Sequence, residues 1–94
     1  METRYIKITE YCDKEKVDIS FLLELAQEGI LHIERVEEID YLNREDLRNI
    51  EMFSRWHYDL GVNTEGIDAM RHMLQRIREM QNEIQILQRK LDFF

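Results

Sequence analysis

The chain has 94 residues, enough for one small domain or for one domain with an extension. Charged residues make up 35% of the sequence, Gly is rare and Pro is absent, which predicts a mostly helical protein without a flexible linker. The one cysteine, Cys12, excludes an intrachain disulfide framework and a cysteine-paired metal site. The sequence has neither a signal-peptide core nor the ~18 apolar residues of a membrane span, so we expect a cytoplasmic protein without a membrane partner.

The formal net charge of −7 is unevenly distributed along the chain. Residues 63–94 contain five acidic and five basic side chains, which leaves fifteen acids against eight bases in residues 1–62. The first part of the chain therefore carries the whole charge. Such a field repels phosphate backbones and attracts basic partners.

The chain opens with a short alternating segment, Tyr5–Ile8, which predicts a strand. Thr9 is the expected N-cap of a first helix that ends near Glu15. Tyr11 and Cys12 are expected to face the core from this helix.

A second helix is predicted over Ile19–Glu28, with Asp18 as its N-cap and Gly29 as its stop. Phe21 and Leu23 fall outside its apolar stripe. The first two helices have the spacing of a helix-turn-helix motif. The stripe itself consists of Leu22, Leu25 and Ala26.

Two β-like runs follow, at residues 30–33 and 38–42, with residues 34–37 between them. Together they predict a small two-stranded wing. Asn43 then caps a third helix, with Asp46 in the third position of an approximate capping box, and Gly61 ends it. The apolar stripe expected of this helix is Leu47, Ile50, Phe53, Trp56 or His57, and Leu60.

The final helix is expected to start after Asn63 and to reach the end of the chain. With Met70 at heptad position a, every a and d position is apolar over three to four heptads, which is typical of a coiled coil. Its first two turns are expected to pack on residues 1–62, and from Ile77 onward a second chain explains the repeat better. We thus divide the chain into an acidic winged helix-turn-helix domain, 1–62, and a dimerisation helix, 63–94. The predicted dimerisation residues are Met70, Met73, Leu74, Ile77, Met80, Ile84, Leu87, Leu91 and Phe94.

This order of elements resembles the winged-helix regulators of the MerR family over nearly the whole chain. The resemblance implies a mostly α fold, a MerR-like winged helix-turn-helix with a small β wing and a long C-terminal coiled-coil helix. It also implies a homodimer, whose long helices usually pair antiparallel. The landmarks are Ile8, Val17-Asp18, Leu22, Glu28-Gly29-Ile30-Leu31, Tyr41, Glu45-Asp46-Leu47, Leu60-Gly61 and Ile67.

The sequence departs from the MerR pattern where DNA contact is expected. MerR regulators generally carry Arg and Tyr on the second helix, where this chain has Ser20, Leu23 and Glu24. Reading guanine edges and holding phosphates both require cationic or donor side chains. We therefore do not expect DNA to be the partner of this surface. In the wing, one base, Arg35, stands against four acids: Glu34, Glu37, Glu38 and Asp40.

A narrower resemblance accounts for the departure. The opening Ile8-Thr9-Glu10-Tyr11-Cys12, the segment Val17–Gly29 and the segment Leu60–Leu91 are similar to the CbpM family of chaperone modulators. That resemblance implies a non-enzymatic protein that binds the J-domain of a DnaJ/CbpA-like co-chaperone and inhibits its action on the Hsp70 DnaK. The orientation of the coiled coil stays open, because Ile at a with Leu or Met at d favours parallel pairs in model systems.

The candidate partner surface is the one that a DNA reader would offer to the groove. Here it combines acidic residues with one exposed leucine, as a hot spot with a polar rim does. The simpler interpretation is a solvated charged face. The surface comprises Leu23, Glu24, Gln27, Glu28, Glu37, Glu38 and Asp40.

The remaining chemistry favours no enzyme, cofactor or metal site. Asp68 and His72 lie four apart on one helical face, and without a third ligand they are better explained as a surface pair. Cys12 and Trp56 are expected in the core rather than in a reactive or recognition role. The alternative function is a MerR-family DNA-binding transcriptional regulator, with the acidic charge offset by Arg4, Lys7, Lys14, Lys16, Arg44 and Arg48.

Overall fold

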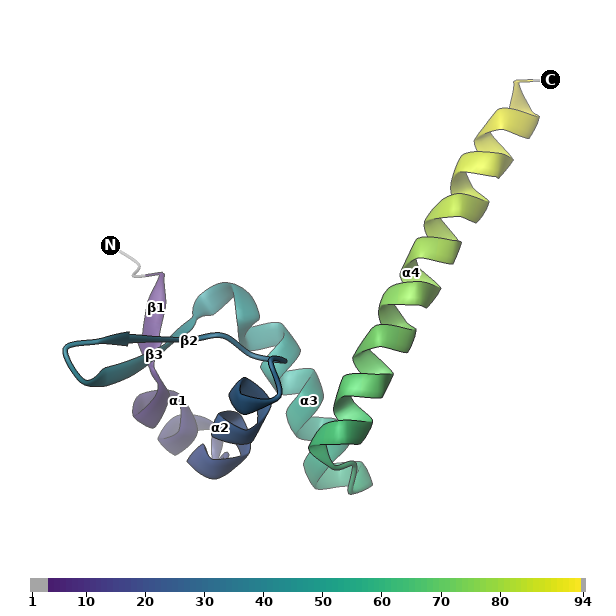
Figure 1. Cartoon of the computed structure of the whole chain (residues 1–94). Helices are drawn as coiled ribbons and strands as arrows, with labels where there is room; N and C mark the ends of the chain where they lie inside the picture. Colours follow the sequence, from purple (N-terminus) through teal and green to yellow (C-terminus); the bar gives the residue numbers. More distant parts are fainter. Residues whose placement is uncertain (1–3, 94) are drawn as a thin grey trace.

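A computed structural model describes residues 4–93 of the chain and confirms the predicted fold class. The protein is mostly helical, with a small antiparallel sheet and a long C-terminal helix, as in a winged helix-turn-helix (Figure 1). Between residues 4 and 93, no helix is both long and apolar enough to span a membrane. The elements are β1 (Tyr5–Lys7), α1 (Ile8–Glu15), α2 (Ile19–Gln27), β2 (Ile33–Val36), β3 (Ile39–Asn43), the 3-10 turn η1 (Arg44–Asp46), α3 (Leu47–Leu60) and α4 (Thr64–Asp92).

The wing is a three-stranded antiparallel sheet in the order β1-β3-β2. The sequence predicted two of these strands for the wing and did not place β1 in the same sheet. Leu42 of β3 is completely buried and stands opposite Ile6 on one side and Ile33 on the other. Because side chains alternate along a strand, this register puts one face of the sheet on the core and the other in solvent.

The hairpin starts later than the sequence predicted. Strand β2 covers Ile33–Val36 instead of 30–33, and its turn is Glu37-Glu38 instead of 34–37. The reason is the end of α2, where Gly29 adopts a left-handed φ of 75°. The Ile30 N–H donates to the Leu25 carbonyl and the Gly29 N–H to that of Ala26, which is a Schellman motif. This motif holds the chain against the helix until Leu31, which is buried.

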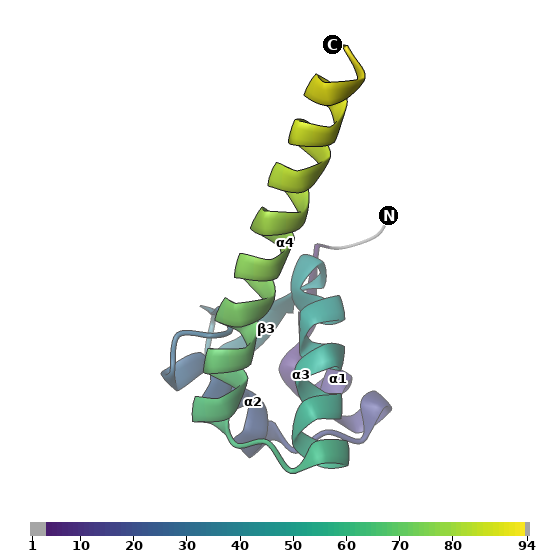
Figure 2. The same cartoon turned by 90° about the vertical axis from the view of Figure 1, so that its right-hand side faces the viewer.

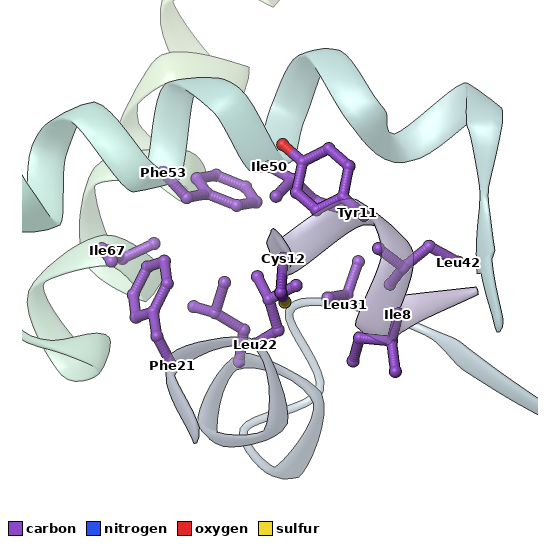
Figure 3. Packing of buried hydrophobic residues seen from close by; sticks show 11 residues of the cluster. Ile8, Tyr11, Cys12, Phe21, Leu22, Leu31, Leu42, Ile50, Phe53 and Ile67 are labelled. Atoms are coloured by element: carbon purple, nitrogen blue, oxygen red, sulfur yellow. The ribbon is translucent and has the colours of Figure 1, made fainter. Parts of the chain in front are cut away.

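The core lies where α1, α2, α3, the wing and the base of α4 meet (Figure 3). Phe21, predicted to lie outside the α2 stripe, is only 3% exposed because it stacks on His57 of α3 at a centroid distance of 4.3 Å. Leu60, predicted in the α3 stripe, is 68% exposed because it is the last residue of α3. The buried residues are Ile8, Tyr11, Cys12, Phe21, Leu22, Leu25, Leu31, Leu42, Ile50, Phe53 and Ile67.

The predicted N-cap positions of α2 and α4 agree with the structure, but those of α1 and α3 do not. Asp46, and not Asn43, occupies the N-cap position of α3, and its side chain makes no capping hydrogen bond. Helix α1 starts at Ile8, so Lys7 and not Thr9 occupies the N-cap position. The Asn63 side chain accepts a hydrogen bond from the Gly66 N–H at 2.8 Å, and the Asn43 side chain accepts one from Glu45 at 2.9 Å. The second bond closes η1, a 3-10 turn that precedes α3.

Asp18 occupies the predicted N-cap position of α2, but its side chain makes no capping hydrogen bond. Its backbone N–H donates to the Tyr58 hydroxyl of α3 at 3.0 Å. This bond joins the start of α2 to α3. At the same end of α3, Gly61 has a left-handed φ of 69°, which confirms it as the helix stop.

Helix α4 leaves the rest of the molecule at an angle and projects away from it (Figures 1 and 2). Its 29 residues span about 44 Å at 1.5 Å per residue. The radius of gyration is 17.1 Å, well above the ~12 Å expected for a compact domain of this length. Only Ile67, near its start, is buried. We refer to residues 4–62 as the head.

Candidate partner-binding site

The outward side of α2 is acidic and apolar. The buried residues Phe21, Leu22 and Leu25 hold the opposite side of the helix on the core. No residue between Ile19 and Gln27 is basic. The exposed residues are Ile19, Ser20, Leu23, Glu24, Gln27 and Glu28, and Leu23 is 46% exposed. We call Leu23, Glu24, Gln27 and Glu28 the α2 surface.

Two carboxylates of the α2 surface lie at the C-terminal end of the helix, where a negative charge is unfavourable. Glu24 is in the last turn of α2 and Glu28 is its C-cap residue, and the last turn contains no base. The C-terminus of a helix carries a partial negative charge, so an acid there costs about 0.3–1 kcal/mol. These two charges therefore do not serve the stability of α2.

The turn of the wing carries the next two acids. Glu37 and Glu38 are both exposed and both have left-handed φ values, 50° and 67°. This pair of conformations is that of a two-residue type I′ hairpin turn, in which Asn-Gly is strongly preferred. Two adjacent glutamates in left-handed conformations are strained and repel each other. We call these two residues the wing tip.

Asp40, the last member of the predicted surface, differs from the others. It is half-buried and stands directly opposite Arg35 in the register of β2 and β3. The Arg35 Nε atom lies 3.6 Å from its carboxylate Oδ1 atom. Asp40 is therefore partly neutralised, and the unopposed carboxylates of the predicted surface are on the α2 surface and at the wing tip.

The bases proposed for DNA contact lie in two parts of the head, and Arg4 and Arg44 are neighbours, since the Arg44 N–H donates to the Arg4 carbonyl at 2.9 Å. Lys14 and Lys16 lie at the end of α1, whereas Arg44 and Arg48 lie in η1 and the first turn of α3. Arg4 and Lys7 precede or lie in β1. None of them is on α2, the helix that a helix-turn-helix protein inserts into the major groove.

The predicted dimerisation stripe of α4 is exposed along most of its length. Met70 and Leu74 are half-buried beside Ile67, which confirms that the first turns pack on the head. Phe94 lies outside the described residues. The other side chains of the stripe are exposed to 58% (Met73), 46% (Ile77), 41% (Met80), 54% (Ile84), 58% (Leu87) and 73% (Leu91).

The groups that could carry chemistry have structural roles here. Burial, and to a lesser extent the charge of Asp18, raises the pKa of the Cys12 thiol, so the thiol stays protonated. The His57 Nδ1 atom lies 2.9 Å from the Val62 carbonyl oxygen, and its ring stacks on Phe21.

The other two histidines lie near carboxylates at the surface. The His32 Nε2 atom is 2.9 Å from a carboxylate oxygen of Glu34. The Asp68 carboxylate is 2.7 Å from Arg71 and 3.7 Å from His72. Among the described residues, no three His, Cys, Asp or Glu side chains are grouped to hold a metal ion.

Sequence reasoning singled out the acidic residues but missed an apolar feature of the wing. The face of the sheet that points away from the core exposes Val36 and Ile39 beside a hollow. The signal was present, since the alternation in residues 38–42 puts Ile39 and Tyr41 on one face. Whether that face lay on the core or in solvent depended on the register.

Comparison with known proteins agrees with this geometry. The family model described as "MerR HTH family regulatory protein" matches residues 6–89, which covers the wing, the helix-turn-helix and almost all of α4. Neither the curated proteins nor the solved structures gave a significant match. The chain therefore belongs to the MerR helix-turn-helix family of regulatory proteins.

Proposed function

We propose that this MerR-family protein is a non-enzymatic modulator that binds the J-domain of a DnaJ/CbpA-like co-chaperone and inhibits its action on Hsp70. The α2 surface is the observation that carries the proposal. It offers exposed Leu23 next to Glu24 and Glu28 in a helix without a base. An apolar anchor with an acidic rim suits a cationic protein surface, and complementary charge accelerates its association.

The same features disfavour nucleic acid. Phosphate contacts supply much of the affinity of any DNA-binding protein, and they require Lys or Arg. Helix α2 has neither, and the net charge of the chain is −7. We therefore interpret the helix-turn-helix as a protein-binding motif.

The second candidate is a DNA-binding transcriptional regulator. The match to a family of MerR regulatory proteins favours it. It would have to use the bases of α1, of α3 and of the region around β1 and η1 instead of α2.

We also propose that two copies pair through α4. A stripe of apolar side chains exposed by 41–73% is unfavourable in water, and a second α4 is the partner that matches its heptad repeat. In an antiparallel pair, facing g positions approach each other. If Ile77 lies opposite Met80 of the partner subunit, then Arg76 approaches Glu83 of the partner subunit, and the symmetric contact repeats this.

The register is distinguishable from its alternatives by charge. Shifting it by one heptad toward the C-terminus brings the two copies of Glu83 together and places Arg76 beside Lys90 of the partner subunit. A parallel pair brings Glu83 next to a neutral glutamine, Gln88 of the partner subunit. The proposed register makes two opposite-charge pairs between Arg76 and Glu83 at the g positions. A shift by two heptads would instead pair Glu83 with Lys90 of the partner subunit, and exchanging the charges of residues 76 and 83 distinguishes the two registers, because it restores the pairs only in the first.

The function is tested by titrating the full chain with the isolated J-domain of a DnaJ/CbpA-like protein from the same organism. We expect saturable binding that weakens at high salt. The variant Glu24→Lys with Glu28→Lys should weaken it at least tenfold. Its matched control, Glu79→Lys with Asp92→Lys, makes the same change of net charge on exposed α4 positions and should bind like the wild type.

Two outcomes would contradict the proposal. One is an absence of J-domain binding at low salt. The other is a low-salt gel shift with generic duplex DNA, which the DNA-binding candidate requires because nonspecific binding is electrostatic.

A further inference from the structure

The wing has a solvent-facing side that neither the α2 surface nor the α4 stripe includes. Directly paired residues share a face, so Val36 and Ile39 stand side by side, as do Glu34 and Tyr41. Arg35, Asp40 and Leu42 belong to the opposite face, which packs on the core through Leu42. We call the solvent-facing side, formed by Tyr5, Lys7, Glu34, Val36, Ile39 and Tyr41, the wing face.

The wing face is apolar and hollowed. Val36 is 55% exposed, Ile39 40% and Tyr5 38%. Tyr5, Glu34, Val36 and Tyr41 line a hollow of about 290 Å³. Sites for small molecules measure about 300–1,000 Å³ and are largely enclosed. A surface hollow at the lower limit of that range suits an anchoring side chain of a protein better than a metabolite.

The charge around the hollow indicates which kind of segment fits. Glu34 lines it, and the wing tip adds Glu37 and Glu38 at the end of the same hairpin. The one base of the hairpin, Arg35, lies on the opposite face, 3.6 Å from Asp40. A segment that covers the hairpin part of the wing face therefore meets an apolar floor and an acidic margin. The base of this face, Lys7 of β1, stands opposite Tyr41 on the other margin.

We propose that the wing face binds a cationic, amphipathic segment of the J-domain, with one aliphatic or aromatic side chain in the hollow and bases near Glu34 and the wing tip. This rests on the proposed function and adds to it a second contact surface on the other side of the hairpin from the core. The wing tip is the end of the hairpin, where its two faces meet. One partner that extends around the wing tip can therefore contact both faces.

The test is calorimetric titration of the full chain with the isolated J-domain. The variant Val36→Thr with Ile39→Thr removes the exposed apolar groups but keeps β-branched side chains, so the strands are retained. We expect it to weaken binding at least tenfold. Ile86→Thr on α4, where Ile86 is 43% exposed, is the matched control and should bind like the wild type.

A second readout does not depend on substitution. In spectra of the ¹⁵N-labelled chain titrated with the J-domain, the amide signals of residues 34–41 should shift at the same partner concentrations as those of α2. If the double variant binds normally and the signals of residues 34–41 do not move, while Glu24→Lys with Glu28→Lys still weakens binding, the inference about the wing face is wrong and the proposed function stands. If the wild type does not bind the J-domain, both are wrong.

Discussion

The charge of Glu83 offers a sharp test of how two copies of α4 pair. In the proposed antiparallel register, Glu83→Arg replaces two attractive contacts with Arg76 of the partner subunit by two repulsive ones. Arg76 and Glu83 are exposed, and an exposed ion pair or like-charge pair changes stability by about 0.3–0.5 kcal/mol. Two attractions lost and two repulsions gained amount to about 1–2 kcal/mol. The dimer dissociation constant should therefore rise about 5–30-fold.

Sedimentation equilibrium over a range of concentrations measures this constant directly. The swapped variant Arg76→Glu with Glu83→Arg restores both pairs with reversed polarity, so it should dimerise close to wild-type strength. High salt should reduce the difference between the two variants, because the charges are exposed. Asn82→Arg adds a base at a neighbouring position outside the seam and serves as the control.

The alternatives make a different prediction. In the register shifted by one heptad, Glu83→Arg exchanges one like-charge contact for another, and in a parallel pair residue 83 approaches an uncharged Gln88. Both leave the dissociation constant unchanged. An unchanged constant would therefore refute the register, and a chain that stays monomeric at every concentration would refute the pairing of α4.

Three further predictions concern the head. Glu28→Lys should raise the free energy of unfolding by about 0.3–1 kcal/mol in urea denaturation, because it places a cation at the C-terminus of α2; a loss of stability would show that Glu28 supports the fold. Glu37→Asn with Glu38→Gly should stabilise the head by about 1 kcal/mol by relieving left-handed glutamates, and more than Glu37→Gln with Glu38→Gln, which removes the charge alone; equal effects would mean that strain is absent. The pKa of the Cys12 thiol is raised above its ordinary 9.0 by burial, so the unfolded chain ionises first and stability falls as the pH rises above 9. Urea midpoints between pH 8 and 10 should show a smaller alkaline decline in Cys12→Ala, and an identical decline would contradict this cause.

The helices were predictable because their signals are local. Gly29 and Gly61 each follow an apolar stripe and end a helix, because glycine adopts a left-handed conformation at little cost. Asn43 and Asn63 cap through side-chain bonds to residues two and three positions ahead. Such interactions involve neighbouring residues alone, so the sequence contains everything that determines them.

The wing and the α2 stripe were predicted less well because distant residues determine them. Phe21 is buried because the ring of His57 stacks on it from another helix. The first strand of the hairpin begins three residues later than predicted because the Schellman motif at Gly29 keeps Ile30 and Leu31 on the helix. A shift of strand pairing changes which face is buried, so the hollow of the wing face depended on a register that alternation alone does not set.

The charge of the candidate surface was determined by the sequence alone, because no folding can place a base on a helix that contains none. The heptad repeat of α4 was likewise inherent in the spacing of its apolar residues. Tertiary structure decided which carboxylates are unopposed, since the register pairs Asp40 with Arg35 and leaves the wing tip without a base. It also decided that α4 projects from the head, because only the first turns of that helix find apolar neighbours there.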